Sequence, residues 1–120
     1  MADIATVVDN YIAAWNETDA AGRRALISEA FAEDATYVDP LVSGDGTDGI
    51  DAMIGGVQGA YPGHSFKLAS GPDAHHDRVR FTWHMFGPDG AGPVAIGLDF
   101  ATVADDGRLQ DVTGFLEQPS

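Results

Sequence analysis

The spacing of apolar residues changes along this chain, and the change limits the folds that it can adopt. Between residues 4 and 15 apolar side chains recur every three or four positions, which predicts an amphipathic helix. Between residues 78 and 86 they recur at every second position, which predicts a strand with one buried face. Helices followed by antiparallel hairpins favour an α+β fold, in which three N-terminal helices pack on one face of a curved, mainly antiparallel sheet.

Caps and turn residues set the expected boundaries of the other elements. A second helix is predicted from a cap at Thr18 or Asp19 to about Ala30, and a third from about residue 47 to 60. The other expected strands cover residues 35–40, 66–68, 94–103 and 109–116. Residues 43–49 are expected to form a loop and residues 71–73 a turn, because both are rich in glycine and aspartate. With no repeat or linker, residues 1–120 are expected to form a single domain.

The charge and composition exclude several classes of function. The chain has 19 acidic and 6 basic residues, a formal net charge of −13, and no cysteine. Nucleic acids and anionic membranes are bound through Lys and Arg, so neither is an expected partner. The four histidines lack metal-ligand spacing and no phosphate-binding glycine motif is present, so we expect neither a metal nor another cofactor. The N-terminus does not resemble a signal peptide, which makes a cytoplasmic location the default expectation.

Asp39 is the first candidate for a catalytic group. It precedes Pro40, which favours an extended backbone at Asp39, and it lies on the same side of its short strand as Tyr37. A carboxylate beside an apolar cavity is poorly solvated and is a usable base near neutral pH. The alternative is an ordinary turn aspartate, a common feature before proline.

Asp99 is the second candidate, because it interrupts an otherwise apolar strand. An ionised carboxylate is costly to bury alone, so Asp99 is expected to be exposed, paired or protonated. Gly97 and Ala101 flank it on the same face and leave room for a ligand or another chain.

Tyr11 and Trp15 lie one turn apart on one helix face. Core packing is the simpler role for that pair, although a buried tyrosine hydroxyl needs a partner.

The strand over residues 78–86 has two possible orientations. If Val79, Phe81 and Trp83 face the helices, the opposite face lies outside and is available for a dimer contact. That opposite face consists of Arg78, Arg80, Thr82 and His84. The reverse orientation places two arginines and a histidine in the interior and favours an anionic ligand. Alternation alone is compatible with both.

Four segments together resemble the SnoaL-like branch of the nuclear transport factor 2-like superfamily. They are YIAAWN from Tyr11, FAEDATYVDP from Phe31, GLD from Gly97 and DGRL from Asp106. The resemblance covers nearly the whole chain and implies a cone-shaped fold around a deep pocket. The superfamily includes polyketide cyclases, ketosteroid isomerases, limonene epoxide hydrolases, scytalone dehydratases and proteins without catalytic activity.

The ketosteroid isomerases provide the most specific correspondence. In them a tyrosine of the first helix and a neutral aspartic acid of a late strand bind the enolate oxygen, while an aspartate of an Asp-Pro motif moves the proton. Tyr11, Asp99 and Asp39 fall on these three positions. The resemblance thus implies that these three residues are catalytic. The implied apolar wall of the pocket consists of Trp15, Tyr37, Trp83 and Phe115.

The implied function is cofactor-free acid–base catalysis on a small hydrophobic carbonyl compound, by enolisation and isomerisation or by aldol-type cyclisation. One alternative is a non-catalytic dimeric module that binds a hydrophobic ligand. Another is an epoxide hydrolase, which would require Arg78 or Arg80 to point inward beside two aspartates. Relatives commonly pair through the outer face of the sheet, so a homodimer is expected.

Overall fold

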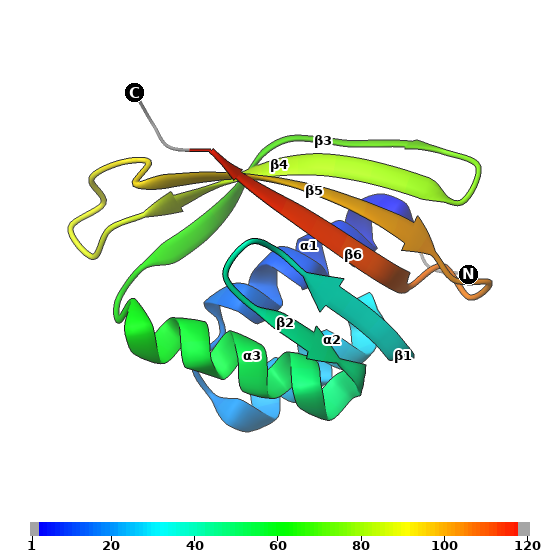
Figure 1. Cartoon of the computed structure of the whole chain (residues 1–120), viewed down its shortest axis with the longest axis horizontal. Helices are drawn as coiled ribbons and strands as arrows, with labels where there is room; N and C mark the ends of the chain where they lie inside the picture. The colour runs from blue at the N-terminus through cyan, green and yellow to red at the C-terminus, as the bar shows by residue number, and fades with distance from the viewer. Residues whose placement is uncertain (1–2, 118–120) are drawn as a thin grey trace.

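The computed structural model describes residues 3–117 and has the α+β architecture that the periodicity predicts. The helices are α1 (Ile4–Asn16), α2 (Ala20–Ala30) and α3 (Gly46–Ala60). The strands are β1 (Phe31–Val38), β2 (Ser43–Asp45), β3 (Ser65–His75), β4 (Arg78–Phe86), β5 (Ala95–Val103) and β6 (Leu109–Glu117). They form one sheet in the order β2-β1-β6-β5-β4-β3, antiparallel except for the parallel pair β1–β6. The helices lie on one side of the long strands (Figure 1).

The first two helices begin at aspartate caps. The Asp3 carboxylate accepts a hydrogen bond from the Thr6 N–H, and the Asp19 carboxylate accepts one from the Gly22 N–H. Each bond satisfies a backbone donor that the helix leaves free at its N-terminus. The predicted stripe of α1 is buried, including Tyr11 at 1% exposure. This part of the sequence prediction is confirmed.

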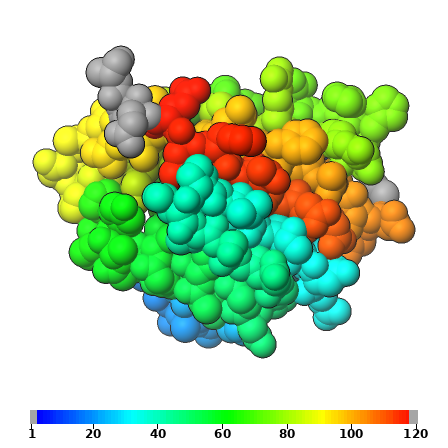
Figure 2. Space-filling model, viewed as in Figure 1, coloured from blue at the N-terminus to red at the C-terminus, as the bar shows by residue number. Residues whose placement is uncertain are grey.

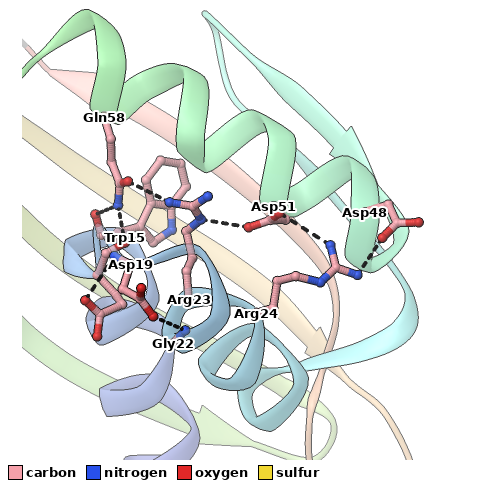
Figure 3. A network of polar contacts seen from close by, with 9 residues as sticks. Trp15, Asp19, Gly22, Arg23, Arg24, Asp48, Asp51 and Gln58 are labelled. Atoms are coloured by element: carbon pink, nitrogen blue, oxygen red, sulfur yellow. Dashed lines mark hydrogen bonds and ion pairs between the residues drawn. The ribbon is translucent and has the colours of Figure 1, made fainter.

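A polar network joins α2 to α3 and to the end of α1 (Figure 3). Arg23 of α2 donates from Nε to Asp51 Oδ1 at 2.7 Å and from a terminal nitrogen to Gln58 Oε1 at 2.9 Å. The Gln58 amide then donates to the backbone carbonyls of Trp15 at 3.0 Å and Glu17 at 2.8 Å. These bonds satisfy carbonyls that the helix end leaves free, and they fix α3 against the turn of α1 that carries Trp15.

Two local predictions are wrong. Residues 71–73 do not form a turn, because β3 continues through them and pairs with β4 as far as His75. Gly71 has a φ of +91° and packs so closely on β4 that a Cβ would lie 3.0 Å from the Arg80 carbonyl oxygen. The register shifts on both sides of Ser70, so the glycine marks a bulge within the strand. The expected loop over 43–49 instead forms β2 and the first turn of α3.

The inner face of β4 is apolar, which decides between its two possible orientations. Phe81 is 2% exposed and Trp83 8% exposed, and both belong to the hydrophobic core together with Val79. Arg78 and Arg80 are exposed on the opposite face, away from the helices. The arginines therefore lie outside the molecule's interior. None of the helices described between residues 3 and 117 is long and apolar enough to span a membrane.

Candidate active site

A cavity of about 860 Å³ lies between the helices and the inner face of the sheet. Most of the side chains that line it are apolar. Its polar and ionisable side chains are Tyr11, Trp15, Tyr37, Asp39, Ser43, Tyr61, His64, Trp83 and Glu117. No lysine or arginine of the described chain lines the cavity. The interior therefore suits an uncharged, largely hydrophobic molecule better than an anion.

Asp39 lies directly after β1 and lines the cavity, as the sequence predicts. Its Oδ1 accepts the backbone N–H groups of Leu41 at 2.8 Å and Val42 at 2.9 Å, and its Oδ2 accepts the Tyr37 hydroxyl at 2.6 Å. A carboxylate has about four lone-pair positions for such bonds. Three are occupied, so the carboxylate is held in one orientation and one lone pair of Oδ2 is left to accept a proton.

Asp99 lies on the inner face of β5 and is completely buried. Its Oδ2 accepts two hydrogen bonds, from the Tyr11 hydroxyl at 2.7 Å and from Trp83 Nε1 at 3.1 Å. Burial raises the pKa of Asp99 to about 7; the two donors oppose the rise, and the negative charge of Asp39 adds to it. Asp99 does not line the cavity itself, but both of its hydrogen-bond donors, Tyr11 and Trp83, do. Of the outcomes expected for Asp99, the structure excludes exposure and shows a buried carboxyl that is hydrogen-bonded to Tyr11 and Trp83.

Gly114 of β6 is the point at which the two acidic residues approach each other. It lies opposite Asp99 in the β5–β6 ladder. A Cβ at Gly114 would lie 2.8 Å from Asp99 Oδ1, 3.1 Å from Asp39 Cβ and 3.1 Å from the Tyr37 hydroxyl oxygen. The missing side chain therefore provides the space in which these groups converge. Sequence reasoning missed Gly114, although a glycine within a strand is a known sign of such a close approach.

Trp83 has a polar contact that the sequence did not reveal. Its ring packs against Gly97, where a Cβ would be only 2.1 Å from two ring atoms. The interpretation of Gly97 as room for a ligand or another chain is wrong, because the Trp83 ring occupies that space. In this position the indole N–H reaches Asp99 two residues further along β5. Trp83 thus both lines the cavity and supports the buried carboxyl.

Tyr11, Tyr37 and Trp15 form an aromatic group beside the two acidic residues. Burial raises the pKa of both tyrosines above the ordinary value, with the Asp99 charge as the next cause, so both hydroxyls keep their protons at neutral pH. The ring centroids of Trp15 and Tyr37 are 5.5 Å apart, and both rings line the cavity. The predicted wall positions of Trp15, Tyr37 and Trp83 agree with this geometry.

Phe115 does not belong to the wall, and its expected position there is wrong. It is 57% exposed and lies outside the cavity lining. The strand alternation explains the difference, because Gly114 points inward and its neighbour Phe115 therefore points outward. Phe115 instead lies opposite Leu98 on the outer face of the sheet.

Asp99 is expected to make the stability depend on pH. Its pKa is about 7 in the folded protein and about 3.9 in an unfolded chain, so the folded state binds this proton more tightly. The stabilisation is complete below about pH 4 and is lost as the pH rises through 7. Relative to Asp99→Asn, the wild type should therefore lose about 1.4 kcal/mol per pH unit between pH 5 and 7 and nothing further above pH 8. Urea unfolding of both proteins checks this; parallel pH profiles would contradict it.

Comparisons with known proteins agree with this architecture. The sequence profile of the SnoaL-like domain matches residues 8–112. A crystal structure from Agrobacterium tumefaciens, provisionally named an isomerase of the SnoaL-like family, is 44% identical, with a TM-score of 0.88 over 94% of this chain and 96% of that one. No match was found among curated proteins.

Two more distant structures share the fold. One, from Sinorhizobium meliloti and provisionally named a polyketide cyclase, is 19% identical, with a TM-score of 0.70 over 91% of this chain and 93% of that one. The other, an NTF2-like protein of unknown function from Exiguobacterium sp. 255-15, is 21% identical, with a TM-score of 0.73 over 94% and 99%. The matched profile spans most of the chain and the Agrobacterium protein covers nearly all of it, so this chain is a member of the SnoaL-like family.

Proposed function

We propose that this protein is an enzyme that removes a proton beside the carbonyl group of a small hydrophobic compound, using only its own side chains. The observation that carries the proposal is the arrangement around Gly114, where Asp39 and the Tyr11–Asp99 pair approach one apolar cavity. Asp39 is the base, and Tyr11 with Asp99 stabilises the oxygen on which negative charge develops. The isomerase and cyclase names of the similar proteins support the same class of reaction.

The proposed reaction needs no reagent other than the substrate and the side chains of the protein. Oδ2 of Asp39 takes the α-proton, the electron pair of the broken C–H bond forms the enolate double bond, and the carbonyl π electrons move to oxygen. In a β,γ-unsaturated ketone, Asp39 then returns the proton to the γ-carbon while the enolate electrons re-form the carbonyl group, which gives isomerisation. In a substrate with a second carbonyl group, the enolate carbon instead bonds to that carbonyl carbon, whose π electrons move to oxygen, and the alkoxide takes the proton from Asp39, which gives aldol-type cyclisation.

Asp99 acts on this step through Tyr11. While Asp99 is ionised, the Tyr11 hydroxyl uses its single proton in the hydrogen bond that it donates to Asp99 Oδ2. Once that oxygen is protonated, the same hydrogen bond reverses, with Asp99 donating to Tyr11 and the Tyr11 O–H turning toward the cavity. A neutral Asp99 therefore frees Tyr11 to bind the enolate oxygen, and the pKa of about 7 allows this form near neutral pH.

The lining of the cavity supports a neutral carbonyl compound as the substrate class. An anionic substrate would meet Asp39 and Glu117 in this cavity without a lysine or arginine from the described chain to pair with it. Arg78 and Arg80 lie on the outer face, so neither can complete the Asp-Arg-Asp arrangement of an epoxide hydrolase. The observations therefore favour the carbonyl reaction over the hydrolase.

Proton exchange with solvent tests the proposal before a natural substrate is identified. The protein is incubated in D₂O with cyclohexanone, 2-decalone and 1-tetralone, and deuterium at the α-carbon is followed by mass spectrometry. We expect incorporation well above the buffer rate for at least one ketone. Ketone binding without incorporation would overturn the catalytic proposal and leave a module that only binds hydrophobic ligands.

We also propose that two copies of the chain pair through the outer face of the sheet. Leu98, Phe100 and Phe115 are 37%, 42% and 57% exposed there, and β5–β6 pairing places Leu98 beside Phe115. Apolar side chains gathered on one face are typical of an interface. Sedimentation should give twice the chain mass for the wild type and for the helix-side control Thr6→Glu, and a single chain mass for Phe100→Glu. A monomeric wild type would refute the pairing.

A further inference from the structure

Two buried side-chain atoms of the described chain have no hydrogen-bond partner, and both belong to residues around Tyr11. They are Trp15 Nε1 and Asp99 Oδ1. Most buried polar atoms in native proteins are paired, so an unpaired atom needs a specific explanation. Asp99 Oδ1 lies in the space beside Gly114 and carries no charge in the neutral acid, whose proton is on Oδ2. Trp15 Nε1 has no such alternative, because an indole N–H is only a donor.

The position of Trp15 favours an acceptor that comes from a ligand. Trp15 is 7% exposed and lines the cavity. Trp15 acts to lower the pKa of Tyr11 against the larger effect of burial, but its N–H forms no hydrogen bond to the Tyr11 hydroxyl. Its backbone is held by Gln58 (Figure 3). The donor is therefore held in place with no partner among the described side chains.

We propose that Trp15 is a ligand-binding hydrogen-bond donor, whose indole N–H binds the same carbonyl oxygen that Tyr11 faces. This inference rests on the proposed function for the substrate class and adds a residue that selects it. Tyr11 donates its only hydroxyl proton to Asp99 in a hydrogen bond. Whether that proton can bind a ligand therefore depends on the protonation of Asp99. The Trp15 donor does not depend on Asp99. The cavity consequently selects an apolar skeleton that carries a carbonyl oxygen over a hydrocarbon of the same shape.

Because the chain has only two tryptophans, a hydrogen bond from the Trp15 indole N–H to a ligand can be observed directly by NMR. A proton–nitrogen correlation spectrum contains two indole N–H signals, which Trp15→Phe assigns; backbone-linked assignment of the wild type serves if that variant does not fold. The wild type is titrated with 4-methylcyclohexanone and with methylcyclohexane. We expect the Trp15 proton to move downfield with the ketone alone, as a new hydrogen bond requires. An unmoved Trp15 signal, or equal shifts with both probes, would overturn the inference.

The affinities of variants for the two probes distinguish a hydrogen bond made by Trp15 from its packing against the ligand. Trp15→Phe should weaken binding of the ketone about tenfold relative to methylcyclohexane, the size of one neutral hydrogen bond. The matched control is Phe66→Leu, since Phe66 lines the same cavity 5.5 Å from the Trp15 ring but has no polar atom. It should change the binding of both probes equally. A tryptophan variant that behaves like this control would reduce Trp15 to a packing residue.

The two proposals fail in different ways. If the indole signal responds to the ketone but no deuterium enters the α-carbon, the proposed reaction is wrong and Trp15 remains a binding donor. If exchange occurs and the indole signal stays unchanged, the reaction stands and the role of Trp15 is wrong.

Discussion

Asp39→Asn is expected to lower the rate of α-proton exchange by about a thousandfold or more, the scale of a general base. Asparagine has nearly the same shape, and its carbonyl oxygen can still accept the backbone N–H groups of Leu41 and Val42, as Oδ1 of Asp39 does now. Its amide nitrogen, however, takes the place of Oδ2 and cannot accept a proton, and the Tyr37 hydroxyl that now donates to Oδ2 can turn to accept from this nitrogen. We therefore expect the melting temperature to remain near that of the wild type. Exchange by mass spectrometry and thermal unfolding measure the two effects.

Asp9→Asn is the matched control for this variant, because Asp9 is an exposed acid of α1 and its replacement removes the same charge. It should exchange α-protons at the wild-type rate. Wild-type exchange by Asp39→Asn would show that another group removes the proton. A large loss of stability in that variant would instead assign Asp39 to the turn after β1.

Gly97→Ala is expected to cost about 3 kcal/mol of unfolding free energy, at the upper end of what overpacking costs in a core. A Cβ would lie 2.1 Å from two atoms of the Trp83 ring, so the ring has to leave its position on β5. Trp83 is almost fully buried and would lose its bond to Asp99 as well as its packing. Urea unfolding monitored by circular dichroism gives the free energy directly.

Gly59→Ala distinguishes this clash from a general effect of replacing glycine. Gly59 is an exposed residue of α3 with open space where a Cβ would lie. Alanine there should stabilise the protein by about 0.5–1 kcal/mol, because it favours the helix. If Gly97→Ala unfolded at the same urea concentration as the wild type, the Trp83 ring would have another stable position.

The spacing of apolar residues was sufficient to predict the elements that bury only one face. The stripe of α1 and the alternation of β4 are direct consequences of packing on a single core, so both could be predicted from the sequence. The bulge at Gly71 could not, because its turn-like sequence is overridden by pairing with β4 on both sides. Phe115 shows the same limit, since its direction depends on the register that places Gly114 inward.

The candidate site was predictable in its acidic residues and not in the groups that position them. Asp39 and Asp99 could be singled out because a carboxylate in an apolar context is costly. The contact between Trp83 and Asp99 joins two strands through the space above Gly97, and the unpaired N–H of Trp15 is defined by what surrounds it. Such features exist only in three dimensions, and no spacing in the chain encodes them.

The position of β6 has a consequence for when the candidate site can form during synthesis. This strand follows all the others in the chain, yet it lies between β1 and β5 (Figure 2). Contacts such as Thr36 with Asp111 join residues 75 positions apart, and closing so long a loop is a slow event in folding. Asp39 follows β1 and Asp99 lies on β5, so only β6 joins the strands that carry these two acidic residues. The approach of Asp39 and Asp99 at Gly114 therefore depends on β6, and a chain that lacks this strand would lack the candidate site.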